Sequence, residues 1–179
     1  MISTLFLNIF LIKKRKVFEN GVDGINDLIN TAPTTLSTQF KKISKITIDD
    51  KINKKKTEYS NRYSKSEIDE EGGGEIGMNT ITIKSNNKEE KKYFYSYKTN
   101  ICMLLYEVEK NDKDAFIVGE KKKNQPTLYR DFPLIGSEKF HFPFFLDGFR
   151  FNPLETRNGL YLNGDSNEEA IENRNIIGE

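Results

Sequence analysis

Three glycines in the string GGGEIG, namely Gly72, Gly74 and Gly77, have the GxGxxG spacing of a dinucleotide-binding loop. In such a loop the glycines let the backbone approach a pyrophosphate, which binds at the amino end of the following helix. Here the string follows the acidic run EIDEE and precedes the strand-like run MNTITIK. The acidic side chains would repel a pyrophosphate, and a strand offers no helix terminus. We therefore predict a flexible glycine hairpin and not a nucleotide site.

Other residue types that support catalysis stand in settings that favour structural roles. The sequence contains no GxxxxGK[ST], HExxH, GxSxG or CxxC motif, so the common hydrolytic chemistries lack their residues. His141 has no cysteine or acidic neighbour with which to form a metal site or a catalytic pair. Cys102 lies in the apolar run ICMLLYEV, which predicts burial. A lone cysteine is typical of a reducing compartment, so we expect a cytoplasmic protein. From the missing motifs we also expect a non-catalytic chain without a metal.

The balance of charge indicates neither nucleic acid nor membrane as a partner. Lysine and arginine total 28 against 27 acidic residues, which leaves a net charge of +1. The basic clusters at 13–16, 54–56 and 121–123 lack the interleaved aromatic residues of single-strand binders. The apolar run within residues 1–12 is shorter than the about 20 residues of a spanning helix. We expect it to be a core strand or helix, with a membrane-associated anchor as the alternative.

Arg130 and Asp131 lie between apolar Leu128-Tyr129 and Phe132, where exposed charges are uncommon. A partly buried ion pair would suit this position, and so would an arginine presented to an anion. The ion pair is the favoured interpretation.

The segment from Phe132 to Pro153 is the most unusual part of the chain. It holds seven of the thirteen phenylalanines, which are Phe132, Phe140, Phe142, Phe144, Phe145, Phe149 and Phe151. Burial of one aromatic side chain removes about 150 to 250 Å² from water, so this segment must be buried in its own domain or against a partner.

The remaining pattern predicts an α+β fold with an antiparallel β-meander. A short helix is expected at 21–31, closed by Pro33. Five strands are expected, at 42–49, 78–84, 93–97, 100–107 and 115–118. A polar edge strand is expected at 51–66 and a hairpin turn at 111–114. Four prolines predict irregular structure in the aromatic segment, with turns at Gly136 and at Asp147-Gly148. A final helix begins at a cap formed by Asp165 or Ser166.

This pattern divides the chain into three parts. Residues 1–19 form an apolar entry segment with a basic end, and residues 20–125 form the meander with polar and glycine-rich loops at 51–77. Residues 126–179 hold the aromatic segment and the final helix.

Several short words follow one another in the last part: FPLIG at 132–136, FHFP at 140–143 and FNP at 151–153, with Glu138, Glu155, Arg157 and Gly159. In this order they resemble the stretch that follows the ATP-binding module in sacsin-like proteins. These belong to the GHKL superfamily, which includes gyrase B, histidine kinases and the ninety-kilodalton heat-shock chaperones. The resemblance covers residues 126–174 well and residues 20–118 more loosely.

The resemblance implies a non-catalytic segment of a chaperone-related ATP-binding protein. The family's ATP-binding motifs precede the FPLIG word and are absent from this sequence, so no nucleotide-binding residue carries over. ATP and Mg²⁺ are therefore expected only with a separate upstream module, and the chain is expected to be a fragment, a split product or a truncation. Such ATPases often use a cation from a following domain at the γ-phosphate, and Arg130, Lys121, Lys122 or Lys123 would supply it in trans.

The seven phenylalanines would then form an interface with the ATPase module or with a client protein. The alternative is a free-standing protein-interaction domain with no link to ATP, in which the aromatic segment is ordinary core. An enzyme with an unrecognised site is the third interpretation. Contiguous apolar surface around Phe140 to Phe151 would distinguish the first two, because monomeric proteins rarely expose large apolar patches.

Overall fold

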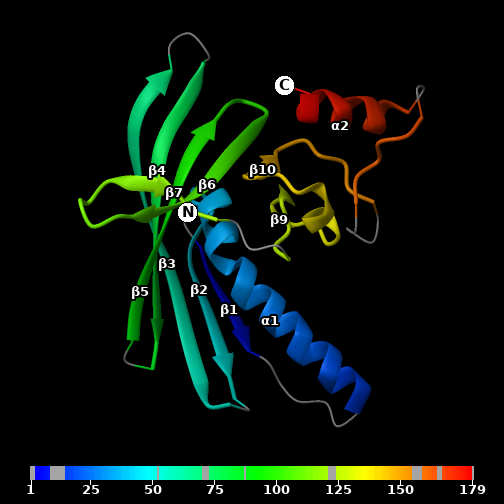
Figure 1. The fold of residues 1–179 in the computed structure, drawn as a ribbon. Coiled ribbons are helices and arrows are strands. Elements are labelled where there is room, and N and C mark those ends of the chain that lie inside the picture. Colours follow the sequence, from blue (N-terminus) through cyan, green and yellow to red (C-terminus); the bar gives the residue numbers. More distant parts are fainter. Residues whose placement is uncertain are drawn as a thin grey trace. The chain divides into compact units, whose positions relative to one another are not determined.

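A computed structural model describes residues 3–8, 15–51, 53–69, 73–86, 88–120, 124–154, 159–164 and 167–178, with 3–8, 15–23 and 69 as backbone only. The predicted α+β class is confirmed, with helices packed on a mostly antiparallel sheet (Figure 1). The helices are α1 (Arg15–Thr38), α2 (Glu168–Gly178) and the 3₁₀ helix η1 (Ser137–Phe140). The strands are β1 (Ser3–Asn8), β2 (Ile43–Asp50), β3 (Lys55–Asp69), β4 (Gly74–Ser85), β5 (Lys88–Lys98), β6 (Cys102–Lys110), β7 (Phe116–Val118), β8 (Leu128–Arg130), β9 (Phe132–Pro133) and β10 (Phe145–Gly148).

The chain divides into two compact units. Unit 1 consists of Met1–Tyr63 and Asn79–Tyr93, and unit 2 consists of Ser64–Met78 and Phe94–Glu179. Strands β3, β4 and β5 therefore contribute residues to both units.

In unit 1 the strand order is β1-β2-β3-β4-β5. Strand β1 pairs parallel with β2, and β2 pairs antiparallel with β3. Helix α1 lies against β2. Alternate residues of the strands point to one face of a sheet, and the buried set includes Ile46, Ile48, Tyr59 and Ile81. Within the apolar run of residues 1–12, Ser3–Asn8 form strand β1, so the strand alternative of the prediction is confirmed for these residues.

Helix α1 is longer than the predicted helix at 21–31 and continues past Pro33 to Thr38. A proline inside a helix removes one backbone hydrogen bond and costs about 3 kcal/mol or more. The segment after Pro33 is held by other contacts, because Leu36 is fully buried and its carbonyl accepts a hydrogen bond from Asn61 Nδ2 at 2.9 Å. The hydroxyl of Ser37 donates to the Pro33 carbonyl at 3.0 Å. Tertiary burial therefore outweighs the local signal for a helix end.

The prediction of an edge strand at 51–66 was wrong in its place in the sheet. Strand β3 lies between β2 and β4, and it extends from Lys55 to Asp69 through residues expected to be loop. Its side chains are polar, but Thr57 and Tyr59 point into the core. A strand with partners on both sides is held by backbone hydrogen bonds that side-chain polarity does not reveal.

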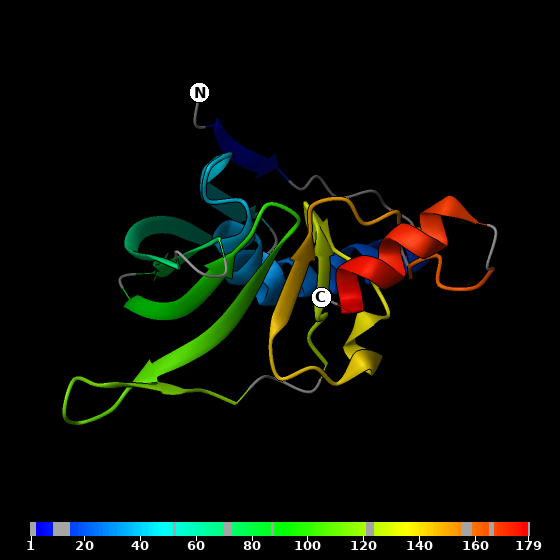
Figure 2. The ribbon, with the colours of Figure 1, turned by 90° about the horizontal axis from the view of Figure 1, so that it is seen from above.

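In unit 2 the strand order is β3-β4-β5-β6-β10-β8-β9, with β7 also paired to β6. One face of this sheet carries an aromatic core, in which the Phe145 ring lies 6.3 Å from Phe94 and 6.1 Å from Tyr129. The opposite face carries a second core cluster of buried apolar residues, which are Leu128, Leu134, Leu146, Phe151, Leu160 and Ile176. Helix α2 lies beside the loop that follows β10 in both views (Figures 1 and 2).

The turn predicted at Asp147-Gly148 lies slightly later in the chain. Both residues belong to β10, which pairs with β6 and β8, and the turn starts at Gly148, whose carbonyl accepts a hydrogen bond from the Phe151 amide at 3.1 Å. An aspartate followed by glycine is a local turn signal, yet here the glycine is required because a larger residue would clash with a neighbouring side chain. A Cβ atom at position 148 would lie 2.5 Å from the Phe151 ring. Gly148 therefore makes room for an aromatic ring over the end of the strand.

Other predicted turns are confirmed. Gly136 adopts a left-handed conformation with φ 89° before η1. At 111–114, the Asn111 amide donates to the Ala115 carbonyl at 2.9 Å and the chain returns as β7. The predicted caps Asp165 and Ser166 lie outside the described residues. Asn167 Oδ1 accepts a hydrogen bond from the Ala170 amide at 3.1 Å and caps α2.

Candidate functional site

The FPLIG word forms a turn that is fixed by one buried hydroxyl. Ser137 Oγ accepts hydrogen bonds from the backbone amides of Thr127 and Leu128, each at 3.1 Å, and donates to the Leu134 carbonyl at 2.6 Å. The Thr127 hydroxyl donates to the Ser137 carbonyl in return, at 2.5 Å. Buried polar groups bonded on every side rigidify the backbone around them. This turn therefore holds β8, β9 and η1 together.

A row of four aromatic rings runs from this turn onto the sheet. The Phe140 and Phe142 rings are stacked with centroids 5.8 Å apart, and the Phe142 and Phe144 rings are stacked at 5.2 Å with an interplanar angle of 5°. Phe144 continues to Tyr106 on β6 at 5.8 Å. Aromatic pairs at these separations contribute about 0.5 to 1.5 kcal/mol beyond their burial. We call these four residues the aromatic row.

The aromatic row lies at the surface of unit 2, above the second core cluster. Phe142 and Phe144 are half-buried and pack against the second core cluster, whereas Phe140 is 39% exposed. The row is thus held at its two middle rings and open to solvent at Phe140.

The other predicted interface residues separate into core and surface. Phe145 and Phe151 are 1% and 2% exposed and belong to the interior of unit 2. Phe132 is 43% exposed, and Phe149 is half-buried beneath the ammonium group of Lys98, which lies 5.7 Å from its ring centroid. The two sequence interpretations, interface and core, therefore describe different members of one segment.

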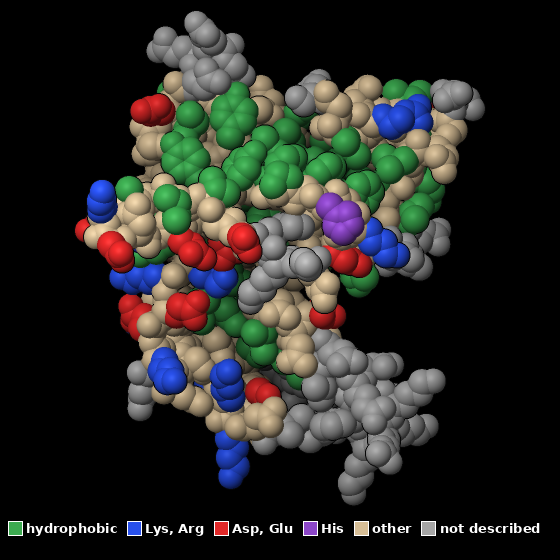
Figure 3. All heavy atoms as spheres, in the orientation of Figure 1, with side chains coloured by type: hydrophobic (Ala, Val, Ile, Leu, Met, Phe, Trp, Pro, Cys, Tyr) green, Lys and Arg blue, Asp and Glu red, His purple; other side chains and the backbone are tan. Residues whose placement is uncertain are grey.

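Strand β5 adds tyrosines that the sequence interpretation did not assign to an interface. Phe94 and Ser96 are buried, so Tyr95 and Tyr97 between and beyond them point to the opposite face. Tyr95 is 42% exposed. Figure 3 shows hydrophobic side chains gathered in a band on the face of unit 2 that this view presents. The alternation in the string YFYSY was the signal that could have found this face.

Helix α2 fixes the far side of the aromatic segment through one asparagine. Asn173 is fully buried, accepts from the Asn152 amide at 2.8 Å, and donates to the carbonyls of Asn152 and Tyr161, each at 2.9 Å. The Arg174 guanidinium donates to the Leu162 carbonyl at 2.7 Å. The FNP word is thus clamped to the helix, and the clamp holds the second core cluster closed beneath the aromatic row.

Strand β7 presents a second apolar surface. Phe116, Ile117 and Val118 are 42%, 52% and 66% exposed, and within the described ranges β7 pairs with β6 alone. An edge strand with exposed apolar side chains is a position to which another strand adds readily.

The proposed cation of the trans mechanism is engaged in an ion pair. Arg130 Nη1 lies 2.5 Å from Asp131 Oδ2, both side chains are about one third exposed at 34% and 38%, and Asp131 has a positive φ of 65°. This is the pairing favoured from the sequence. Lys121, Lys122 and Lys123 lie outside the described residues.

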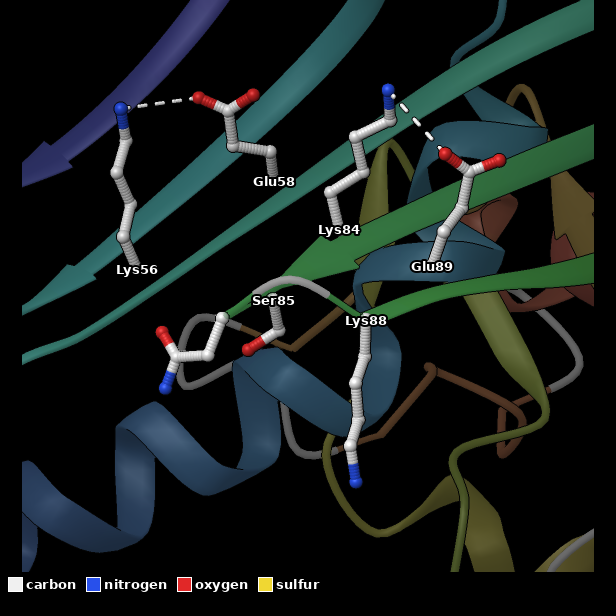
Figure 4. Close-up of a pocket in the computed structure, with 7 residues that line it drawn as sticks. Lys56, Glu58, Lys84, Ser85, Lys88 and Glu89 are labelled. Atoms are coloured by element: carbon white, nitrogen blue, oxygen red, sulfur yellow. Dashed lines mark ion pairs between the residues drawn. The ribbon is translucent and has the colours of Figure 1, made fainter.

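Unit 1 contains a charged hollow at the end of the β4–β5 hairpin (Figure 4). It consists of two adjoining cavities of about 450 and 340 Å³, which share Ser85, Asn86 and Lys88. Hydrogen bonds from Lys45 and Lys56 lower the pKa of the Glu58 carboxyl at its rim. Burial, together with the charge of Glu90, raises the pKa of Tyr59 to about 12.

Among the described residues, no group of three or more histidine, cysteine, aspartate or glutamate side chains is arranged to hold a metal ion. No helix in the described part has both the length and the apolar character needed to cross a bilayer.

Comparison with known proteins returned no relative: no family model matches the chain, and neither a curated protein nor a solved structure matches it.

Proposed function

We propose that this chain is a non-catalytic protein-docking segment of a sacsin-like, chaperone-related ATP-binding protein. The observation that carries the proposal is the aromatic row, whose half-buried rings stack against the second core cluster and end in the exposed Phe140. We place the protein in the cytoplasm, in keeping with the free thiol of Cys102.

The rigidity of the aromatic row supports docking. Binding a partner costs conformational entropy for each side chain that becomes ordered, and rings already ordered cost less. The Ser137 turn holds one end of the segment and the Asn173 clamp holds the other. Aromatic side chains that are pre-ordered and half-exposed are the residues that dominate binding energy at protein interfaces.

The resemblance of residues 126–174 to sacsin-like proteins supports an ATP-binding module as the partner. ATP and Mg²⁺ would bind to that module. Arg130 is the residue that would reach the γ-phosphate in trans, after exchanging its bond to Asp131 for one to phosphate. Unchanged ATP turnover on replacing Arg130 with alanine in the reconstituted pair would rule out this role.

A free-standing interaction domain without any link to ATP is the second candidate. It is favoured by the core position of Phe145 and Phe151, which shows that part of the aromatic segment serves the fold of this chain itself. Both candidates use the aromatic row for binding, and they differ in the partner.

Calorimetry distinguishes the two candidates. The ATP-binding module of a sacsin-like protein is titrated into this chain, and we expect binding that the double variant Phe140→Ser, Phe142→Ser weakens by at least tenfold. The matched control is Ile171→Ser on α2, an apolar side chain that is 38% exposed and does not belong to the row. ATP alone should give no heat with this chain.

Each other outcome has a defined meaning. No binding by the wild-type chain removes the link to the ATP-binding module and leaves the second candidate. Equal weakening by Ile171→Ser would show that the aromatic row is not the docking surface. Micromolar binding of ATP by this chain alone would overturn the non-catalytic assignment.

A further inference from the structure

The hollow in unit 1 has an excess of positive charge that its own carboxylates do not neutralise. Glu58 Oε2 lies 2.8 Å from Lys45 Nζ, and Glu58 Oε1 lies 3.1 Å from Lys56 Nζ. Glu89 Oε2 lies 3.4 Å from Lys84 Nζ (Figure 4). Both carboxylates that line the larger cavity are therefore already paired with lysines.

Two further lysines line the smaller cavity without such a partner. Among the described residues, neither Lys55 nor Lys88 makes an ion pair. Glu90 lines the same cavity, so it offsets one of the two positive charges. The cavity keeps an excess positive charge, and Lys88 reaches both cavities.

A hydroxyl and an amide complete the set of donors. Thr57 Oγ1 donates to Ser85 Oγ at 3.3 Å, which leaves the Ser85 proton available to a ligand. Asn86 follows at the hairpin turn with a φ of 44° and lines both cavities. Lysines with hydroxyl and amide donors are a set that suits phosphate oxygens.

We propose that this hollow binds a small phosphate anion with two or more negative charges, through Lys55, Lys88 and Ser85. The smaller cavity, at about 340 Å³, falls in the usual range of ligand sites, about 300 to 1,000 Å³. None of the residues that line it is aromatic, so it offers no ring on which a nucleotide base could stack. The anion is therefore a free phosphate species, and the site is independent of the docking surface.

The test uses inorganic pyrophosphate as the probe, titrated calorimetrically at low salt into the folded chain. We expect binding that falls at least tenfold in the double variant Lys55→Gln, Lys88→Gln. Both side chains are exposed, so the variant should fold, which circular dichroism verifies. Lys91→Gln is the matched control, because Lys91 is an exposed lysine of β5 that lines neither cavity.

The outcomes separate a site from diffuse attraction. Retained binding in Lys91→Gln supports the proposal, and an equal loss in both variants overturns it. Absence of pyrophosphate binding to the wild-type chain at millimolar concentration also overturns it. ADP titrated in parallel should bind no more tightly than pyrophosphate, and tighter ADP binding would contradict the assignment to a free phosphate.

Discussion

The two units differ in the types of side chain that they bury and in the types that they expose. The interior of unit 1 is rich in hydroxyls and amides, among them Thr35, Ser37, Thr47 and Asn79, and its hollow is lined by charges. The interior of unit 2 is built on the rings of Phe94, Tyr129, Phe145 and Phe151, and further rings reach its surface. This contrast accords with the two proposals made above, a small anion for unit 1 and a protein partner for unit 2.

The sharpest way to break this comparison is to remove a ring from the interior of unit 2. Phe145→Ala should lower the free energy of unfolding by about 3 to 5 kcal/mol, because it deletes contacts with both Phe94 and Tyr129. Urea denaturation measures the change. Phe140→Ala is the control on the exposed end of the row, and it should cost less than about 1 kcal/mol. Equal losses would mean that the row is core and not surface.

In the polar interior of unit 1, removing a buried group should raise the free energy of unfolding instead of lowering it. Thr35 Oγ1 is buried with no hydrogen-bond partner in the described structure, and valine has the same shape without the hydroxyl. Thr35→Val should raise the free energy of unfolding by about 1 kcal/mol, since burying an unpaired hydroxyl carries a penalty. Thr31→Val is the matched change in the same helix, where the hydroxyl donates to the Asp27 carbonyl at 2.8 Å, and it should lower stability. Destabilisation of the same size in both variants would contradict this account.

The smallest effect is confined to alkaline pH. The pKa of Tyr59 is raised to about 12 in the folded chain, while an unfolded tyrosine ionises near 10. The unfolded state therefore loses its proton first, so this tyrosine makes stability fall as the pH rises from about 10 to about 12. In the variant Tyr59→Phe, stability should fall less between pH 9 and pH 11 than in the wild-type chain, and urea denaturation at the two pH values measures the difference. Identical alkaline slopes in the two proteins would remove Tyr59 as a cause.

The sequence was informative where local pattern and burial agree. The strand near 42–49, the turn at 111–114 and the left-handed Gly136 each follow from alternation or from turn residues. It misled where distant contacts decide the structure. Pro33 does not end α1, because Asn61 binds the backbone beyond it, and Asp147-Gly148 continue β10, because this strand pairs with β6 and β8.

The candidate sites, too, could be predicted from the sequence only as far as local pattern determines them. The abundance of phenylalanine predicted an aromatic surface or core, but alternation had to be combined with strand pairing to show which rings are exposed. The tyrosines of β5 belong to that surface because the sheet turns Phe94 and Ser96 inward. Lys55 and Lys88 line the same cavity although they belong to different strands, and their spacing along the chain does not predict this.

The Asn173 clamp also sets an order of events during synthesis. Its three backbone bonds reach Asn152 and Tyr161, so the second core cluster closes only after α2 has left the ribosome. Chains emerge at about 5 to 20 residues per second, amino end first. For a few seconds the nascent chain therefore exposes Phe151, and the sides of Phe142 and Phe144 that pack against the cluster, before α2 is available to cover them.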